Sequence, residues 1–364
     1  MRRRARTHTA LAKRVHDLAC SRHVFPVKPS DPSLPLTRRA LLQHAALGFA
    51  AAATLPLSTD AANAPAKSAK APKPDTTPPD LAPLNRFPRL VHDYYLRRIT
   101  EQERATDTAR SRLKSRREAE AFVRERAKLA RECFGPLPPK TPLNPRITGR
   151  VERDTYTIEN VIFDSRPEFP VTGNLYLPKR DRRPLPAVVG VCGHSENGKA
   201  GGTYQSFAQG LARLGYIVLI IDPAGQGERF QCVDANLRRT KGGSTREHNY
   251  VGNQQLLVGE FFGTWQAWDG IRALDYLLTR PEVDAHQVFV TGNSGGGTIT
   301  TWMCALEPRF AGAAPSCFVN TFRRLMEHEE PQDAEQCPPR ALAHGLSHSD
   351  FFLPFVPRRL LLLG

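Results

Sequence analysis

Hydrophobic residues in the second half of the chain fall into short runs separated by longer amphipathic segments. Several runs are continuously apolar and rich in β-branched residues, which is typical of strands buried on both faces of a parallel sheet. The two earliest runs flank a proline-containing turn and predict an antiparallel pair. The predicted strands are residues 155–163, 171–177, 185–192, 216–221, 287–291, 310–316 and 359–363.

The segments between these runs predict helices. Residues 255–279 place a stripe of apolar side chains on one helical face. Residues 298–306 predict a second helix directly after a strand. Strand–helix alternation of this kind predicts an α/β fold, with a mostly parallel sheet, helices on both faces and a site at the carboxyl ends of the strands. The stripe consists of Phe262, Trp265, Trp268, Ile271, Leu274 and Leu278.

A highly charged segment precedes this region. Apolar residues recur at helical spacing through residues 88–134, and Gly135-Pro136 is a helix stop signal. We therefore expect one long helix or two shorter ones, forming a helical extension over residues 86–135 that packs against the outside of the main domain. Its alternating charges predict a solvated face.

The amino terminus has the features of an export signal. Paired Arg38 and Arg39 precede a short apolar stretch at 45–57 and an A-x-A pattern at 62–64. These features resemble a twin-arginine signal, although a basic tail beside an alanine-rich helix is the alternative. We expect residues 1–64 to be a leader read by the twin-arginine export machinery, giving a periplasmic or extracellular protein. The apolar stretch is too short for a stable membrane anchor.

Residues 65–85 are rich in proline and alanine, and we expect them to form a linker.

Charge and cysteine content narrow the class of function. The formal net charge is +15, but thirteen Lys and Arg against five Asp and Glu lie in the first 80 residues. The rest of the chain therefore shows no basic nucleic-acid-binding module, and we expect no nucleic-acid partner. Seven cysteines without a C-x-x-C pair predict neither a disulfide scaffold nor a zinc site, and we expect Cys192 and Cys304 to be buried hydrophobes.

The candidate chemistry lies at Gly292-Asn293-Ser294-Gly295-Gly296, a G-x-S-x-G motif. A predicted strand precedes it and a predicted helix follows, which is the context that this motif needs. The turn is strained and presents Ser294 above the sheet edge. Free N–H groups at the helix amino terminus then face a developing oxyanion.

From about residue 150 the order of elements resembles the α/β-hydrolase fold. Within that fold the chain resembles acetylxylan esterases and esterases of the dienelactone-hydrolase type. Three stretches carry this resemblance: residues 192–199 (Cys-Gly-His-Ser-Glu-Asn-Gly-Lys), the glycine turn at 222–229 and the G-x-S-x-G motif. The resemblance implies a small-molecule or carbohydrate ester as substrate, acetylated carbohydrate above all, and no cofactor.

The resemblance also implies a mechanism. Ser294 attacks an ester carbonyl and forms an acyl-enzyme that water hydrolyses. The oxyanion is held by the backbone N–H groups of Gly295 and of the loop at His194. His194 is expected to contribute its main chain, and its ring is as well suited to a structural hydrogen bond as to substrate contact. In this fold the nucleophile is followed along the chain by an acid and then a histidine.

The acid and the histidine are harder to place. Residues 359–363 resemble the strand after which the acid usually comes, so one expectation is a hydrolase domain, residues 150–364, that is incomplete after its penultimate strand. Such a chain would expose an apolar edge strand and be poorly soluble. In the alternative expectation, the triad is completed earlier in the chain, with Glu329 or Glu335 as acid and His344 or His348 as base.

We take Glu335 and His348 as the candidate pair. The two candidate histidines also have a structural interpretation. They lie four residues apart beside Leu342 and Leu346, a spacing that is typical of a surface helix. That spacing would suit a metal, but no third ligand is evident, and we expect no metal site.

Other functions fit parts of the sequence. Gly193 to Lys199 satisfies G-x-x-x-x-G-K, but Ala200 replaces the Ser or Thr of a nucleotide-binding P-loop. A catalytically dead hydrolase acting as a binding module and a serine peptidase of the prolyl-oligopeptidase type are the alternatives within the fold. The polar segment 231–252 either borders the pocket or is a solvated loop. Its candidate substrate contacts are Arg246, Glu247, His248 and Tyr250.

Overall fold

The structure is a computed structural model that describes residues 87–180, 184–330 and 332–364. The predicted leader, residues 1–64, and the predicted linker, residues 65–85, lie outside the described residues and stay predictions. None of the described helices has the length and apolar character needed to cross a membrane.

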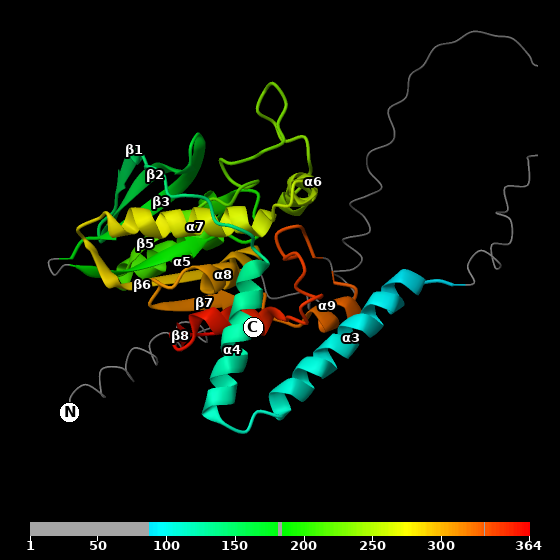
Figure 1. Ribbon diagram of the computed structural model, residues 1–364. Helices are drawn as coiled ribbons and strands as arrows, with labels where there is room; N and C mark the ends of the chain where they lie inside the picture. Colours follow the sequence, from blue (N-terminus) through cyan, green and yellow to red (C-terminus); the bar gives the residue numbers. More distant parts are fainter. Residues whose placement is uncertain (1–86, 181–183, 331) are drawn as a thin grey trace, which may run out of the picture. The chain divides into compact units, whose positions relative to one another are not determined.

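Within the described residues, eight strands form one sheet in the order β1-β2-β3-β5-β4-β6-β7-β8 (Figure 1). The first three strands and the β3–β5 pair are antiparallel, and every later pairing is parallel. This confirms the predicted mixed but mostly parallel sheet. The strands are β1 (Arg146–Glu152), β2 (Tyr156–Arg166), β3 (Phe169–Pro178), β4 (Leu185–Val191), β5 (Ile217–Ile221), β6 (Val283–Asn293), β7 (Gly312–Ser316) and β8 (Arg359–Leu360).

Helices cover both faces of this sheet, as predicted (Figure 1). Helices α7 (Phe262–Leu278) and α8 (Gly295–Leu306) pack on one face, and α5 (Gly202–Arg213) packs on the other. The central strand β5 is buried throughout, and its side chains alternate between the two cores. Apolar side chains are thus required at every position of this strand, which explains its unbroken hydrophobic run.

The charged extension forms two helices, α3 (Leu90–Ser111) and α4 (Arg116–Glu132). Ser115 separates them because its hydroxyl accepts the amide of Glu118 while the Glu118 carboxylate accepts the amide of Ser115, a reciprocal cap at the start of α4. The expectation of a purely solvated charged face is wrong at Arg126. Its guanidinium is buried and pairs with Asp350 at 2.8 Å.

The region before α7 differs from the sequence expectation. The helix predicted over 255–279 is divided, because α6 (Ser244–Leu257) ends before Gly259, whose φ of +79° few other residues adopt. The expectation of a solvated loop at 231–252 is wrong for α6, since Glu247 and His248 are fully buried there. Strand β1 was not predicted, and its largely exposed residues explain why no hydrophobic pattern marks it.

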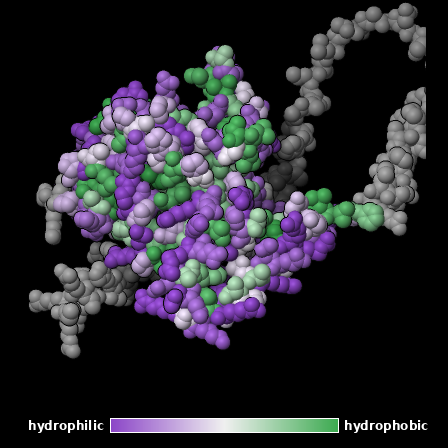
Figure 2. Space-filling view, viewed as in Figure 1, coloured by the Kyte–Doolittle hydropathy of each residue, from purple (hydrophilic) through white to green (hydrophobic). Residues whose placement is uncertain are grey.

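Two short elements complete the described chain. Helix α9 (Phe322–Glu327) packs against α3, and the 3-10 helix η2 (His348–Phe355) packs against α4 and α8. Strand β8 pairs with β7 alone, and the four leucines at 360–363 remain 36–50% exposed, as predicted for an apolar edge strand. Figure 2 shows a mostly hydrophilic surface along α3 and α4, with apolar side chains gathered at the amino-terminal end of α3.

Candidate active site

Ser294 lies at the junction between β6 and α8, where its backbone adopts φ 57° and ψ −120°. A positive φ with this ψ is costly for a residue with a side chain, and such strain typically persists at functional positions. The flanking glycines permit the turn. A Cβ on Gly292 would lie 2.5 Å from the Gly296 oxygen, and one on Gly296 would lie 2.3 Å from the Val191 oxygen. Ser294 itself is half-buried and therefore reachable at the carboxyl end of β6.

The loop after β4 lies beside this turn. A Cβ on Gly193 would be 2.2 Å from the carbonyl oxygen of Asn293, so only glycine permits the approach. The amide of Gly193 donates to the Tyr204 hydroxyl at 2.6 Å, and the amide of Ser195 donates to the Gly193 carbonyl at 2.6 Å. Among the described residues, no partner is recorded for the intervening amide of His194. The loop thus presents one open N–H group next to the serine turn.

The buried Asp222 side chain holds this loop in place. Its carboxylate accepts the amide of Lys199 at 2.8 Å and the hydroxyl of Thr172 at 2.7 Å, and it pairs with the Lys199 ammonium. Glu228 also pairs with that ammonium. Lys199, which a P-loop would offer to a phosphate, is therefore neutralised by two carboxylates, which disfavours the nucleotide-binding alternative.

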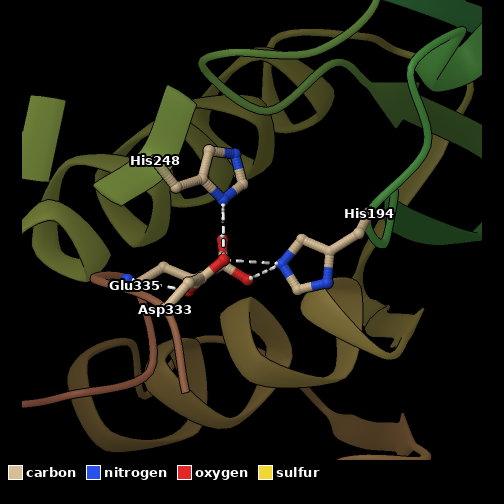
Figure 3. A group of neighbouring side chains, drawn as sticks. All are labelled: His194, His248, Asp333 and Glu335. Atoms are coloured by element: carbon tan, nitrogen blue, oxygen red, sulfur yellow. Dashed lines mark hydrogen bonds and ion pairs between the residues drawn. The ribbon is translucent and has the colours of Figure 1, made fainter. Parts of the chain in front are cut away.

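Glu335 joins a cluster of four side chains beside the serine turn (Figure 3). His194 Nε2 lies 2.9 Å from Glu335 Oε1 and 3.0 Å from Asp333 Oδ2. His248 Nδ1 lies 3.1 Å from the same Asp333 oxygen. The ring of His194 also packs on Gly295, where a Cβ would come within 2.9 Å of Nε2.

The charged groups of this cluster shift the pKa values of His194 and Asp333. Burial disfavours a charged His194, but the neighbouring carboxylates of Asp333 and Glu335, at ion-pair distance, outweigh burial and raise its pKa to about 10. For Asp333, burial again opposes the charge, and contacts with His194 and His248 overcome it and lower the pKa to about 2. The Asp333 carboxylate is thus held in its ionised form.

His348, the candidate base, is enclosed by aromatic side chains. It is fully buried, with its ring stacked on Phe318 at 4.4 Å and edge-on to Phe322 at 4.5 Å between centroids. Its Nδ1 accepts the amide of Asn320 at 3.1 Å. Among the described residues, no contact of His348 with Glu335 or Ser294 is recorded. The expectation of a surface helix at this position is wrong, while the catalytic pairing with Glu335 stays a prediction.

The burial of His348 predicts an acid-sensitive fold. Burial lowers its pKa to about 4, whereas an unfolded histidine takes up a proton near its usual pKa of about 6.5. Stability is therefore lost as the pH falls from 7 towards 4, and this residue alone should cost about 2 kcal/mol between pH 7 and pH 5. Urea unfolding of wild type and His348→Gln at both pH values checks this. Equal losses in the two proteins would contradict the assignment.

Glu329 and His344, the other candidates for acid and base, both contact the helical extension. Glu329 forms an ion pair with Arg89 on the surface. His344 is half-buried, and its carbonyl accepts a hydrogen bond from Arg126 at 3.2 Å. Both positions thus contact the helical extension rather than the serine turn. Cys192 and Cys304 are buried, as predicted, and burial raises the pKa of both thiols.

Sequence reasoning did not assign Asp333 or His248 to this cluster. The sequence alone marks His248 as a substrate contact or a solvated loop residue, and Asp333 as one acidic residue in a polar stretch. The cluster draws on the loop after β4, on α6 and on residues 333–335, which are separated by many residues along the chain. No local spacing connects them, so only the folded structure brings them together.

Comparisons with known proteins match this architecture. The family model for acetyl xylan esterase (AXE1) matches residues 140–336. A putative hydrolase of Bacillus subtilis (strain 168), YtaP, is 28% identical over 203 residues, covering 53% of this chain and 63% of that protein. The chain thus spans less than two thirds of the length of this curated relative.

Solved structures show the same fold. A putative acetyl xylan esterase from Bacteroides fragilis superposes with a TM-score of 0.56 at 18% identity, covering 68% of each chain. Methylesterase BT1017 gives a TM-score of 0.53 at 22% identity, covering 72% of this chain and 55% of the other. With the strand order described above, they confirm the predicted α/β-hydrolase fold.

Proposed function

Because the chain belongs to the acetyl xylan esterase family, we propose that it is a serine esterase acting on acetylated carbohydrate. The observation that carries the proposal is the backbone of Ser294, strained at φ 57° between β6 and α8. A serine held there at the carboxyl ends of parallel strands is the nucleophile of this fold.

In the proposed reaction the Ser294 oxygen attacks the ester carbonyl carbon. The carbonyl oxygen gains negative charge, and the amides of Gly295 and His194 donate hydrogen bonds to it. When the C–O bond to the alcohol breaks, the serine proton leaves on the alcohol and an acetyl-serine remains. Water then adds to this second ester, releasing acetate and restoring the serine hydroxyl. The open amide of His194 and the helix-terminal amide of Gly295 support this assignment.

A hydrolysis assay separates the proposed function from its alternatives. Purified protein is incubated with acetylated xylo-oligosaccharide, with 4-nitrophenyl acetate and with a proline-containing peptide 4-nitroanilide. We expect acetate release from the two esters and none from the peptide. Cleavage of the anilide would instead indicate a prolyl-oligopeptidase type of peptidase. Binding of the oligosaccharide without release of acetate would indicate a catalytically dead binding module.

A further inference from the structure

Four potential metal ligands converge beside the serine turn, and one of them, Glu335, is also the candidate acid of the sequence analysis. His194, His248, Asp333 and Glu335 each offer one ligand atom, and these atoms all lie within 4.8 Å of one another. The last three are buried, and the His194 side chain is 20% exposed. Figure 3 shows the two rings and the carboxylates directed towards a common point.

The spacing of these atoms suits a small tetrahedral ion. The distances from His194 Nε2 and His248 Nδ1 to the carboxylate oxygens of Asp333 and Glu335 range from 2.9 to 3.4 Å. A tetrahedral ion with bonds of about 2.0–2.1 Å separates its ligands by about 3.3 Å. Imidazole nitrogen and carboxylate oxygen are both ligands of Zn²⁺ and related divalent ions.

His248 is oriented as a metal ligand would be. Its Nε2 lies 3.1 Å from the carbonyl oxygen of Ala224, which can only accept a hydrogen bond, so Nε2 carries the proton. In the neutral ring the other nitrogen, Nδ1, then presents a lone pair to Asp333 Oδ2. The contact between Nδ1 and Asp333 Oδ2 at 3.1 Å therefore needs either a proton on Nδ1 or a cation bound by both atoms. A backbone carbonyl that fixes the tautomer in this way is a usual partner of metal-bound histidine.

The surroundings of the Glu335 carboxylate also point to a bound cation. Its side chain is 1% exposed, and both of its carboxylate oxygens lack a hydrogen-bond partner among the described residues, although ring nitrogens lie at ion-pair distance. The Nε2 atom of His194 likewise has no well-directed hydrogen bond. Buried carboxylates without partners are costly. A divalent cation would neutralise the two carboxylates and use the unpartnered atoms.

The chain segment that carries the carboxylates is held in place by its backbone. The amide of Ala334 donates to Asn249 Oδ1 at 2.9 Å, and the amide of Glu335 donates to Asp333 Oδ1 at 3.0 Å. Trp302 Nε1 donates to the Glu335 carbonyl at 2.8 Å. These contacts leave Asp333 Oδ2 and both Glu335 oxygens free of backbone bonds. Ligands fixed by such surroundings are the usual condition for tight metal binding.

We propose that His194, His248, Asp333 and Glu335 bind one divalent transition-metal ion of the Zn²⁺ type. Four protein ligands complete a tetrahedral shell, so the site is structural and leaves no position for substrate. The ion joins the loop after β4, α6 and the segment 333–335, and it rests against Gly295. It thereby fixes the loop that holds the His194 amide. Ser294 is not a ligand, so metal binding can be measured separately from the serine chemistry.

Metal content of the full-length, tag-free protein tests the proposal. The protein is stripped with a chelator, titrated with Zn²⁺ alone and followed by calorimetry, and the zinc edge is examined by X-ray absorption. We expect one equivalent of zinc, bound by two imidazoles and two oxygens at about 2.0–2.1 Å. Saturation should raise the melting temperature by about 5 °C. A wild-type protein that takes up less than a tenth of an equivalent overturns the proposal.

Matched variants locate the ion. Glu335→Gln and His248→Gln should each weaken zinc binding at least about 100-fold. His286→Gln, which alters an exposed histidine in β6, should leave it unchanged. Glu335→Gln is nearly isosteric, so it remains informative if His248→Gln fails to fold. Wild-type affinity in a folded Glu335→Gln protein would place the ion elsewhere and contradict the proposal. Ser294→Ala should bind zinc normally, so loss of esterase activity and loss of the metal site are separately visible.

Discussion

Replacing Ser294 with alanine should reduce hydrolysis of 4-nitrophenyl acetate by at least about 10³-fold in kcat/KM. The substitution removes the attacking oxygen and leaves the turn, the amide of Gly295 and the neighbouring loop in place. Only catalysis by the oxyanion amides and by binding remains, as in other serine hydrolases that lose the nucleophile. Initial rates at substrate concentrations well below KM measure the effect.

Ser206→Ala is the matched control for this variant. Ser206 is exposed on α5, where alanine is a better helix former, so neither the site nor the fold should be harmed. Its kcat/KM should equal that of wild type. If Ser294→Ala kept most of the activity while remaining folded, the hydrolysis would have to come from another residue.

Replacing Trp302 with alanine should lower the free energy of unfolding by about 3–5 kcal/mol. The side chain is fully buried, and its ring packs edge-on against Phe351 at 4.8 Å and Phe134 at 5.5 Å between centroids. Its loss leaves a cavity and also frees the Glu335 carbonyl from its hydrogen bond. Chemical denaturation monitored by circular dichroism measures the change.

Two companion variants separate packing from hydrogen bonding. Trp302→Phe keeps much of the ring volume and should cost about 1–3 kcal/mol, mainly for the unsatisfied carbonyl of Glu335. Trp265→Ala should cost less than Trp302→Ala, because Trp265 is half-buried and stacks on Arg166 near the surface. A cost for Trp302→Ala no larger than that for Trp265→Ala would show that α8 is not anchored through this residue.

Much of the central sheet could be predicted because its strands are buried on both faces. Strand β5 needs an apolar side chain at every position, and that requirement leaves a visible mark in the sequence. Ser294 could be singled out for a related reason. The strained turn needs glycine at 292 and 296, where any Cβ would strike backbone atoms, so the local sequence carries the geometry.

The rest depends on contacts between distant segments. The cluster around Glu335 brings together residues from three parts of the chain, and no periodicity links them. The four-residue spacing of His344 and His348 beside two leucines predicts a surface helix, yet aromatic rings enclose His348. Strand β1 is mostly exposed and is specified by its pairing with β2 rather than by its own hydrophobicity. Tertiary environment overrides local pattern in each case.

The most direct test of the account is the position at which a fluorophosphonate probe attaches. The phosphorus reacts only with an activated serine oxygen and releases fluoride, leaving a stable adduct whose mass can be measured. After digestion, we predict one modified peptide, with the adduct on Ser294, and no labelling of Ser294→Ala. A folded wild-type protein that remains unlabelled, or an adduct on a different serine, would contradict the assignment of Ser294 as the nucleophile.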